Sequence, residues 1–240
     1  MRKIIMGLSP LFLALPSISN AAPLQWQVSE ASGEVRLTQN GQSRAAVRGA
    51  LLASGATITT GAKARAVIVR GEEFVVISPG SQLRVPAANS PNTVMQMIED
   101  FGTAVFKIKK KSTPHFGVQT PYLAAVVKGT TFTVTVGPEG GSVQVTEGAV
   151  EVSTLDGGAA DLVEPGDIAS VGASDLYKLT IEGDASKIIR SENGPAASGV
   201  VTSSKALPAQ GASATSAAPT VSADRSPSTA ARSQTSRGRR

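Results

Sequence analysis

Few side chains in this 240-residue chain are suited to chemistry. His115 is the only histidine and cysteine is absent, which nearly excludes Cys/His zinc sites and thiol nucleophiles. His115 follows Pro114 in a polar link between apolar runs, a position typical of a surface histidine. We therefore expect no catalytic residue, no metal site, no cofactor and no enzyme activity.

Acidic pairs are the remaining candidates for catalysis. They are Glu72-Glu73, Glu99-Asp100, and Asp161 with Glu164. A glycosidase-type pair needs two carboxyls about 5–9 Å apart across a cleft. Because neighbouring residues of a strand point to opposite faces, adjacent acids do not converge on one substrate. We interpret these acids as solvated turns, and an enzyme with an unrecognised carboxylate site is the weakest hypothesis.

A dense basic run is a further candidate for function. It comprises Lys107, Lys109, Lys110 and Lys111, and Lys128 follows nearby. A charged edge strand that resists pairing with other chains explains such a run without a ligand. The alternative is a docking site for an anionic partner, such as a lipid phosphate or an acidic cell-wall polymer. We treat these five lysines as candidate interaction residues.

The first residues have the order of a secretory signal peptide. Arg2 and Lys3 precede an apolar run over 4–15, and Ser19 and Ala21 supply the small side chains that a signal peptidase needs. We expect residues 1–21 to be removed. An uncleaved anchor is less favoured, because the run is shorter than the about 20 residues that span a bilayer. The mature protein is thus expected to be periplasmic or secreted, without a membrane span.

The basic charge belongs mostly to the ends of the chain. The net charge is +5; the leader contributes +2 and residues 191–240 contribute six cations and two acids, or +4. Subtracting +2 and +4 from +5 leaves −1 for the part between, which does not favour a nucleic-acid partner. Residues 191–240 are rich in Ala, Ser, Thr, Pro and Gly, and we expect a disordered tail.

Residues 25–190 are expected to form an all-β domain. Phe132, Val134 and Val136 alternate with threonines, the period of a half-buried strand. Similar alternations recur at 35–37, 67–69, 104–108, 143–145 and 150–152. Over 94–101 a helical face competes with a strand, and a hairpin turning at Phe101-Gly102 is favoured. Many short strands suit a β-sandwich, or a short β-solenoid or β-roll.

Three stretches resemble the central signature of FecR-type domains. They are Phe116-Gly-Val-Gln-Thr120-Pro121, residues 124–134 and residues 143–152. Weaker likeness extends the resemblance from about Gly33 to Val171. The motif residues, mostly structural, are Thr120, Pro121, Gly129, Thr130, Phe132, Gly148 and Gly166. Lys128 stands where the family usually has Arg, whose planar fork Lys does not reproduce.

The resemblance implies a function outside catalysis. FecR-type proteins that regulate iron uptake combine a cytoplasmic anti-sigma segment, one membrane span and a periplasmic region that contacts an outer-membrane receptor. In this chain a leader stands where the first two parts would be. The resemblance therefore implies a stand-alone periplasmic interaction module, and it does not extend to control of a sigma factor.

Two binding hypotheses follow. The first is protein–protein interaction, sensing or scaffolding with envelope proteins, through strand addition at an open sheet edge. The second is a peptidoglycan or carbohydrate binder in which the arginines of the tail add electrostatic attraction. Trp26 bears on the choice, since it is expected to pack on the core rather than to stack on sugars.

Overall fold

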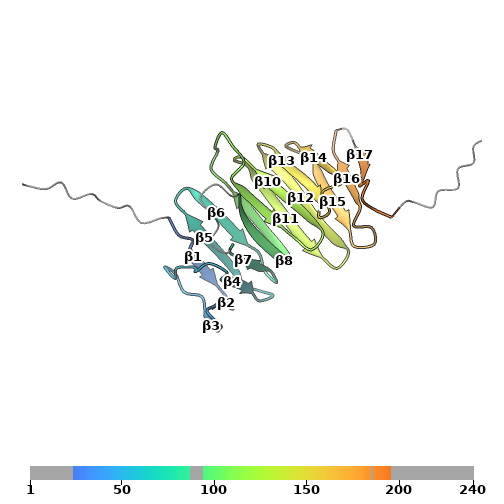
Figure 1. Cartoon of the computed structure of the whole chain (residues 1–240). Coiled ribbons are helices and arrows are strands. Elements are labelled where there is room, and N and C mark those ends of the chain that lie inside the picture. The colour runs from blue at the N-terminus through green and yellow to red at the C-terminus, as the bar shows by residue number, and fades with distance from the viewer. Residues whose placement is uncertain (1–23, 87–93, 185, 196–240) are drawn as a thin grey trace, which may run out of the picture. The chain divides into compact units, whose positions relative to one another are not determined.

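Seventeen strands and no helix make up the described part of the computed structural model, residues 24–86, 94–184 and 186–195. The predicted signal peptide and residues 196–240 of the predicted tail lie outside these ranges. Figure 1 shows the strands in chain order. The all-β expectation is confirmed.

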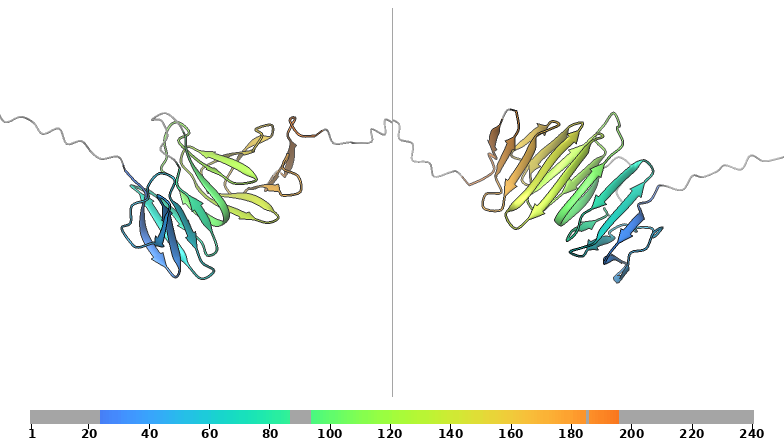
Figure 2. Two further views of the ribbon diagram at one scale, coloured as in Figure 1. Left: turned by 60° about the horizontal axis from the view of Figure 1, so that its bottom comes forward. Right: turned by 180° about the vertical axis from the view of Figure 1, so that it is seen from behind.

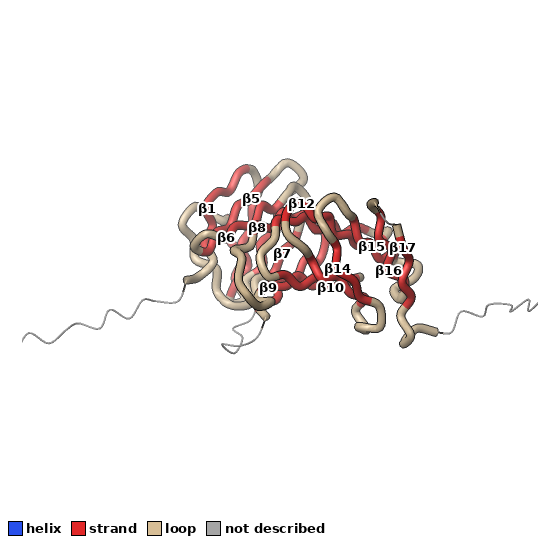
Figure 3. The backbone as a smooth tube through the Cα atoms, turned by 90° about the horizontal axis from the view of Figure 1, so that it is seen from above, coloured by secondary structure: helices blue, strands red, loops and turns tan. Residues whose placement is uncertain are grey.

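The strands form two layers (Figure 3). Neighbours in the first layer pair antiparallel throughout. Its order is β1 (Gln27–Ser32), β5 (Arg65–Arg70), β6 (Glu73–Ile77), β8 (Met95–Lys107), β11 (Thr131–Gly137), β12 (Gly140–Glu147), β15 (Ile168–Gly172), β16 (Lys178–Glu182) and β17 (Lys187–Arg190). Strand number therefore rises steadily across this layer.

The second layer follows almost the same progression (Figure 2). Its order is β3 (Gln42–Ala45), β2 (Val35–Gln39), β4 (Thr57–Thr60), β7 (Gln82–Arg84), β8, β9 (Phe116–Gln119), β10 (Leu123–Val127), β13 (Val150–Thr154) and β14 (Ala160–Val163). Only β8 and β9 pair in parallel. The layered packing is that of a sandwich, while the steady winding from one end to the other is that of a roll.

Strand β8 belongs to both layers. Its first half pairs with β7 and β9, and residues 102–107 pair with β11. The strand bends at Gly102, where φ is +102° and a Cβ would lie 2.4 Å from the Cα of Ser81. Only glycine fits both the positive φ and this close approach. The hairpin expected at Phe101-Gly102 is therefore wrong: the glycine bends one continuous strand and does not reverse it.

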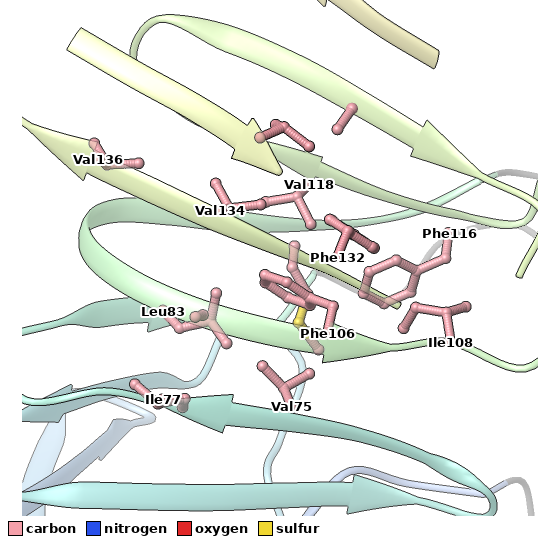
Figure 4. Close-up of a cluster of buried hydrophobic side chains, with 14 of the residues drawn as sticks. Val75, Ile77, Leu83, Phe106, Ile108, Phe116, Val118, Phe132, Val134 and Val136 are labelled. Carbon is pink, nitrogen blue, oxygen red and sulfur yellow. The ribbon is translucent and has the colours of Figure 1, made fainter. Parts of the chain in front are cut away.

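The core lies between the layers. Phe132, Val134 and Val136 are buried, as the alternation in β11 predicts. Across the layers, the ring centroids of Phe106 and Phe116 are 6.0 Å apart, and within the first layer Phe132 stacks on its strand neighbour Phe106 at 5.1 Å. Figure 4 shows these rings meeting. Such aromatic contacts between layers add to the free energy of apolar burial.

Trp26 belongs to this core. It is 3% exposed, and its ring centroid lies 6.4 Å from that of Phe116. The packing expected for Trp26 is confirmed, and sugar stacking by this side chain is excluded because its ring faces the interior.

Candidate functional site: a lysine groove and an open sheet edge

The candidate lysines gather at one end of β8. An open groove of about 460 Å³ is lined by Lys107, Lys109 and Lys110 together with segments of the β10–β11 and β12–β13 turns. The backbone N–H of Lys111 donates to the carbonyl oxygen of Lys128 at 2.7 Å. The fold therefore brings Lys128, distant in sequence, against the basic run.

Lys107 does not protect a sheet edge. It pairs with Phe74 of β6 on one side and with Thr131 of β11 on the other, so β8 is an interior strand of its layer at this point. The edge-strand interpretation of the run is therefore wrong for Lys107. Lys109, Lys110 and Lys111 follow the strand, in a loop whose backbone is hydrogen-bonded to the β10–β11 turn at Ile108 and Lys111.

Two family-motif glycines shape the groove. Gly129 has a φ of +149°, and a Cβ there would lie 2.1 Å from the Cα of Lys110. Gly148 has a φ of +84°, and its Cβ would lie 2.9 Å from the carbonyl oxygen of Gly129. Because neither position has room for a side chain, the lysine loop rests directly on the turn backbone.

The other motif residues support strands and turns. The hydroxyl of Thr120 accepts from the backbone N–H of Leu123 at 2.9 Å and closes the β9–β10 turn, which contains Pro121. The Thr130 hydroxyl donates to the carbonyl oxygen of Ala149 at 3.0 Å. Gly166 has a φ of +97° in the turn before β15, and Phe132 is in the core. These contacts fix the strands and turns in which the motif residues lie.

Three lysines and two glutamates line the groove, which leaves a small excess of positive charge. Lys109 pairs with Glu72, and the ammonium of Lys107 lies 6.0 Å from the ring centroid of Phe74. Among the described residues, Lys110, Lys111 and Lys128 take part in no ion pair. Of these three, Lys110 lines the groove, and its ammonium group is available to an anion.

Next to the groove, Glu73 follows Glu72 but turns inward. Glu73 is 5% exposed, and it accepts two hydrogen bonds from Arg70, at 2.9 and 2.5 Å. Nε2 of His115 lies 3.4 Å from the same carboxylate, and the Arg70 guanidinium lies 4.9 Å from the centroid of the Trp26 ring. The expectations of a solvated Glu73 and of a surface His115 are both wrong.

Glu99 is a second acid that differs from the expectation of a solvated turn. Glu99 is fully buried, and neither carboxylate oxygen has a hydrogen-bond partner among the described residues. Burial raises its pKa from the ordinary value of 4.5 to about 9. The carboxyl is therefore protonated at neutral pH. The alternation along β8 indicates this burial, because Met97 and Glu99 share its inward face. The expectation of a turn at Glu99-Asp100 left this signal unused.

Two other acids of the expected turns are half-buried and paired with cations. Asp100 pairs with Arg84 at 3.1 Å, and Asp161 pairs with Lys187. Within the described ranges, no group of three or more His, Cys, Asp or Glu side chains is placed to hold a metal ion. Likewise, the described residues contain no helix that is long and apolar enough to cross a membrane.

The two ends of the first layer differ in how their edge strands are covered. At β1 the register shifts between Val28 and Glu30, and the backbone of 49–52 bonds to the outer side of the strand. At β17, no described strand pairs with the side facing away from β16. Ile188 of β17 is 64% exposed. Within the described ranges, the C-terminal edge is thus open, while the N-terminal edge is covered.

The comparisons with known proteins concern the middle of the chain. The family model described as FecR protein matches residues 56–151, from β4 into β13. Residues 56–151 are FecR-like. The FecR-like segment contains the whole lysine run, Lys128 and the glycines of the groove, whereas β17 lies outside it. The match is shorter than the resemblance expected from about Gly33 to Val171.

Similar solved structures cover about half of the chain. Two crystal structures, at 2.50 and 1.65 Å resolution, are titled as a "putative anti-sigma factor" from Parabacteroides distasonis. Each has 19% sequence identity and a TM-score of 0.46, and the alignment covers 53% of this chain. The chain spans 59% of the length of that protein. No curated protein matches the sequence.

Proposed function

We propose that this protein is a non-catalytic interaction module of the bacterial periplasm, which binds an extended segment of a partner protein along β17. The observation that supports this most directly is that no described strand pairs with the outer side of β17. An edge strand offers a row of backbone N–H and C=O groups to an added strand. Main-chain hydrogen bonds would supply affinity, and the side chains beside them would select the partner.

The side chains of β17 favour an acidic and partly apolar partner strand. Lys187 and Arg190 stand at its two ends, and Ile188 exposes most of its surface. Opposite charges placed across a strand pair stabilise it, while like charges oppose it. The matching partner therefore carries an apolar residue opposite Ile188, and its acids share the two cations with Asp161 and Asp175, which already pair with Lys187 and Arg190.

A second copy of the chain is a poorer partner for this edge. If two β17 strands met antiparallel about their common centre, Lys187 of one would face Arg190 of the other. That pairing sets like charges directly opposite each other twice, which destabilises it. The charges on β17 thus permit a foreign acidic strand and disfavour self-association in this register.

The FecR-like segment supports an interaction role, since the family resemblance points to a periplasmic contact with another protein. Location in the periplasm is part of the proposal and rests on the signal-peptide pattern of residues 1–21. The experiment begins with fractionation of cells that carry the full chain. Recovery of the mature protein in the cytosol contradicts the proposal.

Photocrosslinking in those cells tests the edge. A photoreactive amino acid is placed at Ile188 or, in a matched control, at Val47, which is 62% exposed. We expect a discrete adduct from position 188 and none from position 47. The adduct should disappear when Arg190 is changed to Glu in the same chain, because the partner's acid then meets a like charge.

The remaining outcomes separate this proposal from its rivals. The same adduct from both positions, or none from position 188, contradicts binding along β17. An adduct that consists of a second copy of this chain contradicts the foreign-partner proposal. Retention of the mature protein on purified sacculi, with no protein adduct, would favour the peptidoglycan-binding alternative.

A further inference from the structure

The lysine groove concentrates charge that the fold itself does not use. Lys107, Lys109 and Lys110 line it, against Glu72 and Glu147 on its walls, so three minus two leaves +1, and Lys111 and Lys128 adjoin it in the loop and the turn, whose backbones are bonded to each other. Glu72 is paired with Lys109, while Lys110, Lys111 and Lys128 have no ion-pair partner among the described residues. Like charges held this close repel one another, and a bound anion would relieve that repulsion.

Protection of a sheet edge does not account for these charges. The strand that leads into the loop is paired on both sides, through Phe74 and Thr131. Unlike β17, this part of the molecule presents no free strand edge that cations would guard. The lysines are also held in place, because the loop backbone is tied to the β10–β11 turn.

The size and floor of the groove fit a small anionic group. Its volume of about 460 Å³ is in the range of small-ligand sites. Gly129 and Gly148 form part of its wall, and because they lack side chains the lysine loop and the two turns pack closely around the groove. The hydroxyl-bearing residues Thr130 and Thr131 stand beside them.

We propose that this groove is a binding site for phosphate ester groups. A phosphate monoester concentrates one to two negative charges on three oxygens, which several ammonium groups can share. Lysine ammoniums act as point charges and need no planar, bidentate geometry. The departure from the family's usual Arg at Lys128 is therefore compatible with this ligand.

An extended acidic peptide fits the groove less well. Around it the backbone groups are already paired, with Ile108 N–H bonded to Thr130 C=O and Lys111 N–H bonded to Lys128 C=O. A peptide would find no free main-chain row there, whereas β17 offers one. The phosphate site and the partner edge are therefore separate surfaces with separate ligands.

The test uses the purified mature chain and three soluble probes: glycerol 3-phosphate, neutral glycerol and hexa-aspartate. Binding is followed by calorimetry and by NMR shifts at low and raised salt. We expect saturable binding of glycerol 3-phosphate that weakens with salt, and none of glycerol. The variant Lys110→Gln/Lys111→Gln should weaken phosphate binding about tenfold, because two charge-assisted contacts are lost.

A charge-matched control keeps the result specific. Lys63→Gln/Arg65→Gln removes the same charge from exposed positions outside the groove, and it should leave the affinity unchanged. Circular dichroism and thermal unfolding confirm that both variants are folded. Equal weakening in both variants, no saturable phosphate binding, or tighter binding of hexa-aspartate would overturn the proposal.

A vesicle experiment distinguishes the source of the phosphate. Vesicles of phosphatidylcholine, with or without phosphatidylglycerol, are sedimented with the protein and with each variant. Retention that requires phosphatidylglycerol and the groove lysines identifies lipid phosphates as ligands. Binding of glycerol 3-phosphate without vesicle retention identifies soluble phosphate esters instead, and both results support the site.

Discussion

The strands before and after β9 bury different kinds of side chain. In β1–β8, the buried residues include Glu73, held by Arg70, and Glu99, which has no partner among the described residues. After β9, the buried polar side chains of the described residues are Thr120, Thr130, Thr154 and Ser191, all of them uncharged; a charged pair of this half, Lys187–Asp161, lies nearer the surface. Among the described residues, the first half thus buries ionisable side chains and the second half does not.

This difference shows that one continuous core can have two kinds of energetics. Removing a partner from a buried charge leaves a desolvated ion, which is costly. Removing an exposed ion pair costs little, because water already screens it. The stability of the first half should therefore respond strongly to mutation and pH at a few acids, and that of the second half should respond to apolar packing.

The largest expected effect is loss of the buried pair in the first half. Glu73→Ala leaves the Arg70 guanidinium, whose side chain is 11% exposed, without its carboxylate. We expect the free energy of unfolding to fall by about 3–4 kcal/mol, measured by urea denaturation. The neighbouring variant Glu72→Ala removes a carboxylate that is 70% exposed and should cost less than about 1 kcal/mol. Equal losses would remove the contrast between inward and outward acids.

The next largest expected effect is a gain, not a loss, in the free energy of unfolding, and it concerns Glu99. Burial raises its pKa from 4.5 to about 9, so between these values the folded state holds a proton that the unfolded state releases. Stability therefore falls as pH rises through this window and levels off above it. Glu99→Gln removes that penalty, and at neutral pH we expect a gain on the order of 2–3 kcal/mol, at about 1.4 kcal/mol for each pKa unit.

The measurement is urea denaturation at about pH 5 and about pH 8, where the wild-type slope should exceed that of the variant. Leu179→Ala is the control from the second half, since Leu179 is fully buried in β16. It should cost about 3 kcal/mol at both pH values, because a methyl-lined cavity does not titrate. A Glu99→Gln variant with the wild-type pH slope would show that this carboxyl is ionised in the folded state.

The smallest expected effect is at the open end of the second half. Lys187 pairs with Asp161 across the layers, but its side chain is 50% exposed. Lys187→Ala should lower the free energy of unfolding by less than about 1 kcal/mol, and the loss should shrink in high salt. A double-mutant cycle with Asp161→Ala measures the coupling. A loss as large as that of Glu73→Ala would show that the two halves do not differ in this respect.

Much of the fold could be predicted because strands carry a local period. The alternation of Phe132, Val134 and Val136 identified β11 and its buried face, and no long-range information was needed. The error at Phe101-Gly102 arose because glycine is compatible with a turn and with a bend. The contact with Ser81, which decides for a bend, joins residues far apart in the chain.

The candidate site was predicted less completely. The basic run is visible in the sequence, but its position in an interior strand depends on pairing with β6 and β11. The burial of Glu73 and Glu99 is not predicted, because an acidic pair is more typical of a solvated turn than of a strand. Each of these acids nevertheless follows the inward alternation of its strand. The contact of His115 with Glu73 joins residues 42 positions apart, and no local sequence pattern predicts it.

By itself, the sequence determined that this protein is built of strands, which of their faces are apolar, and that no cysteine or histidine cluster is available for chemistry. Those properties depend on side-chain identity and on a period of two residues. Only the tertiary structure decided which strand is an edge, which acids are buried and which lysines meet around a groove. Each of these depends on what lies beside a residue in space, and pairing between distant segments sets those neighbours.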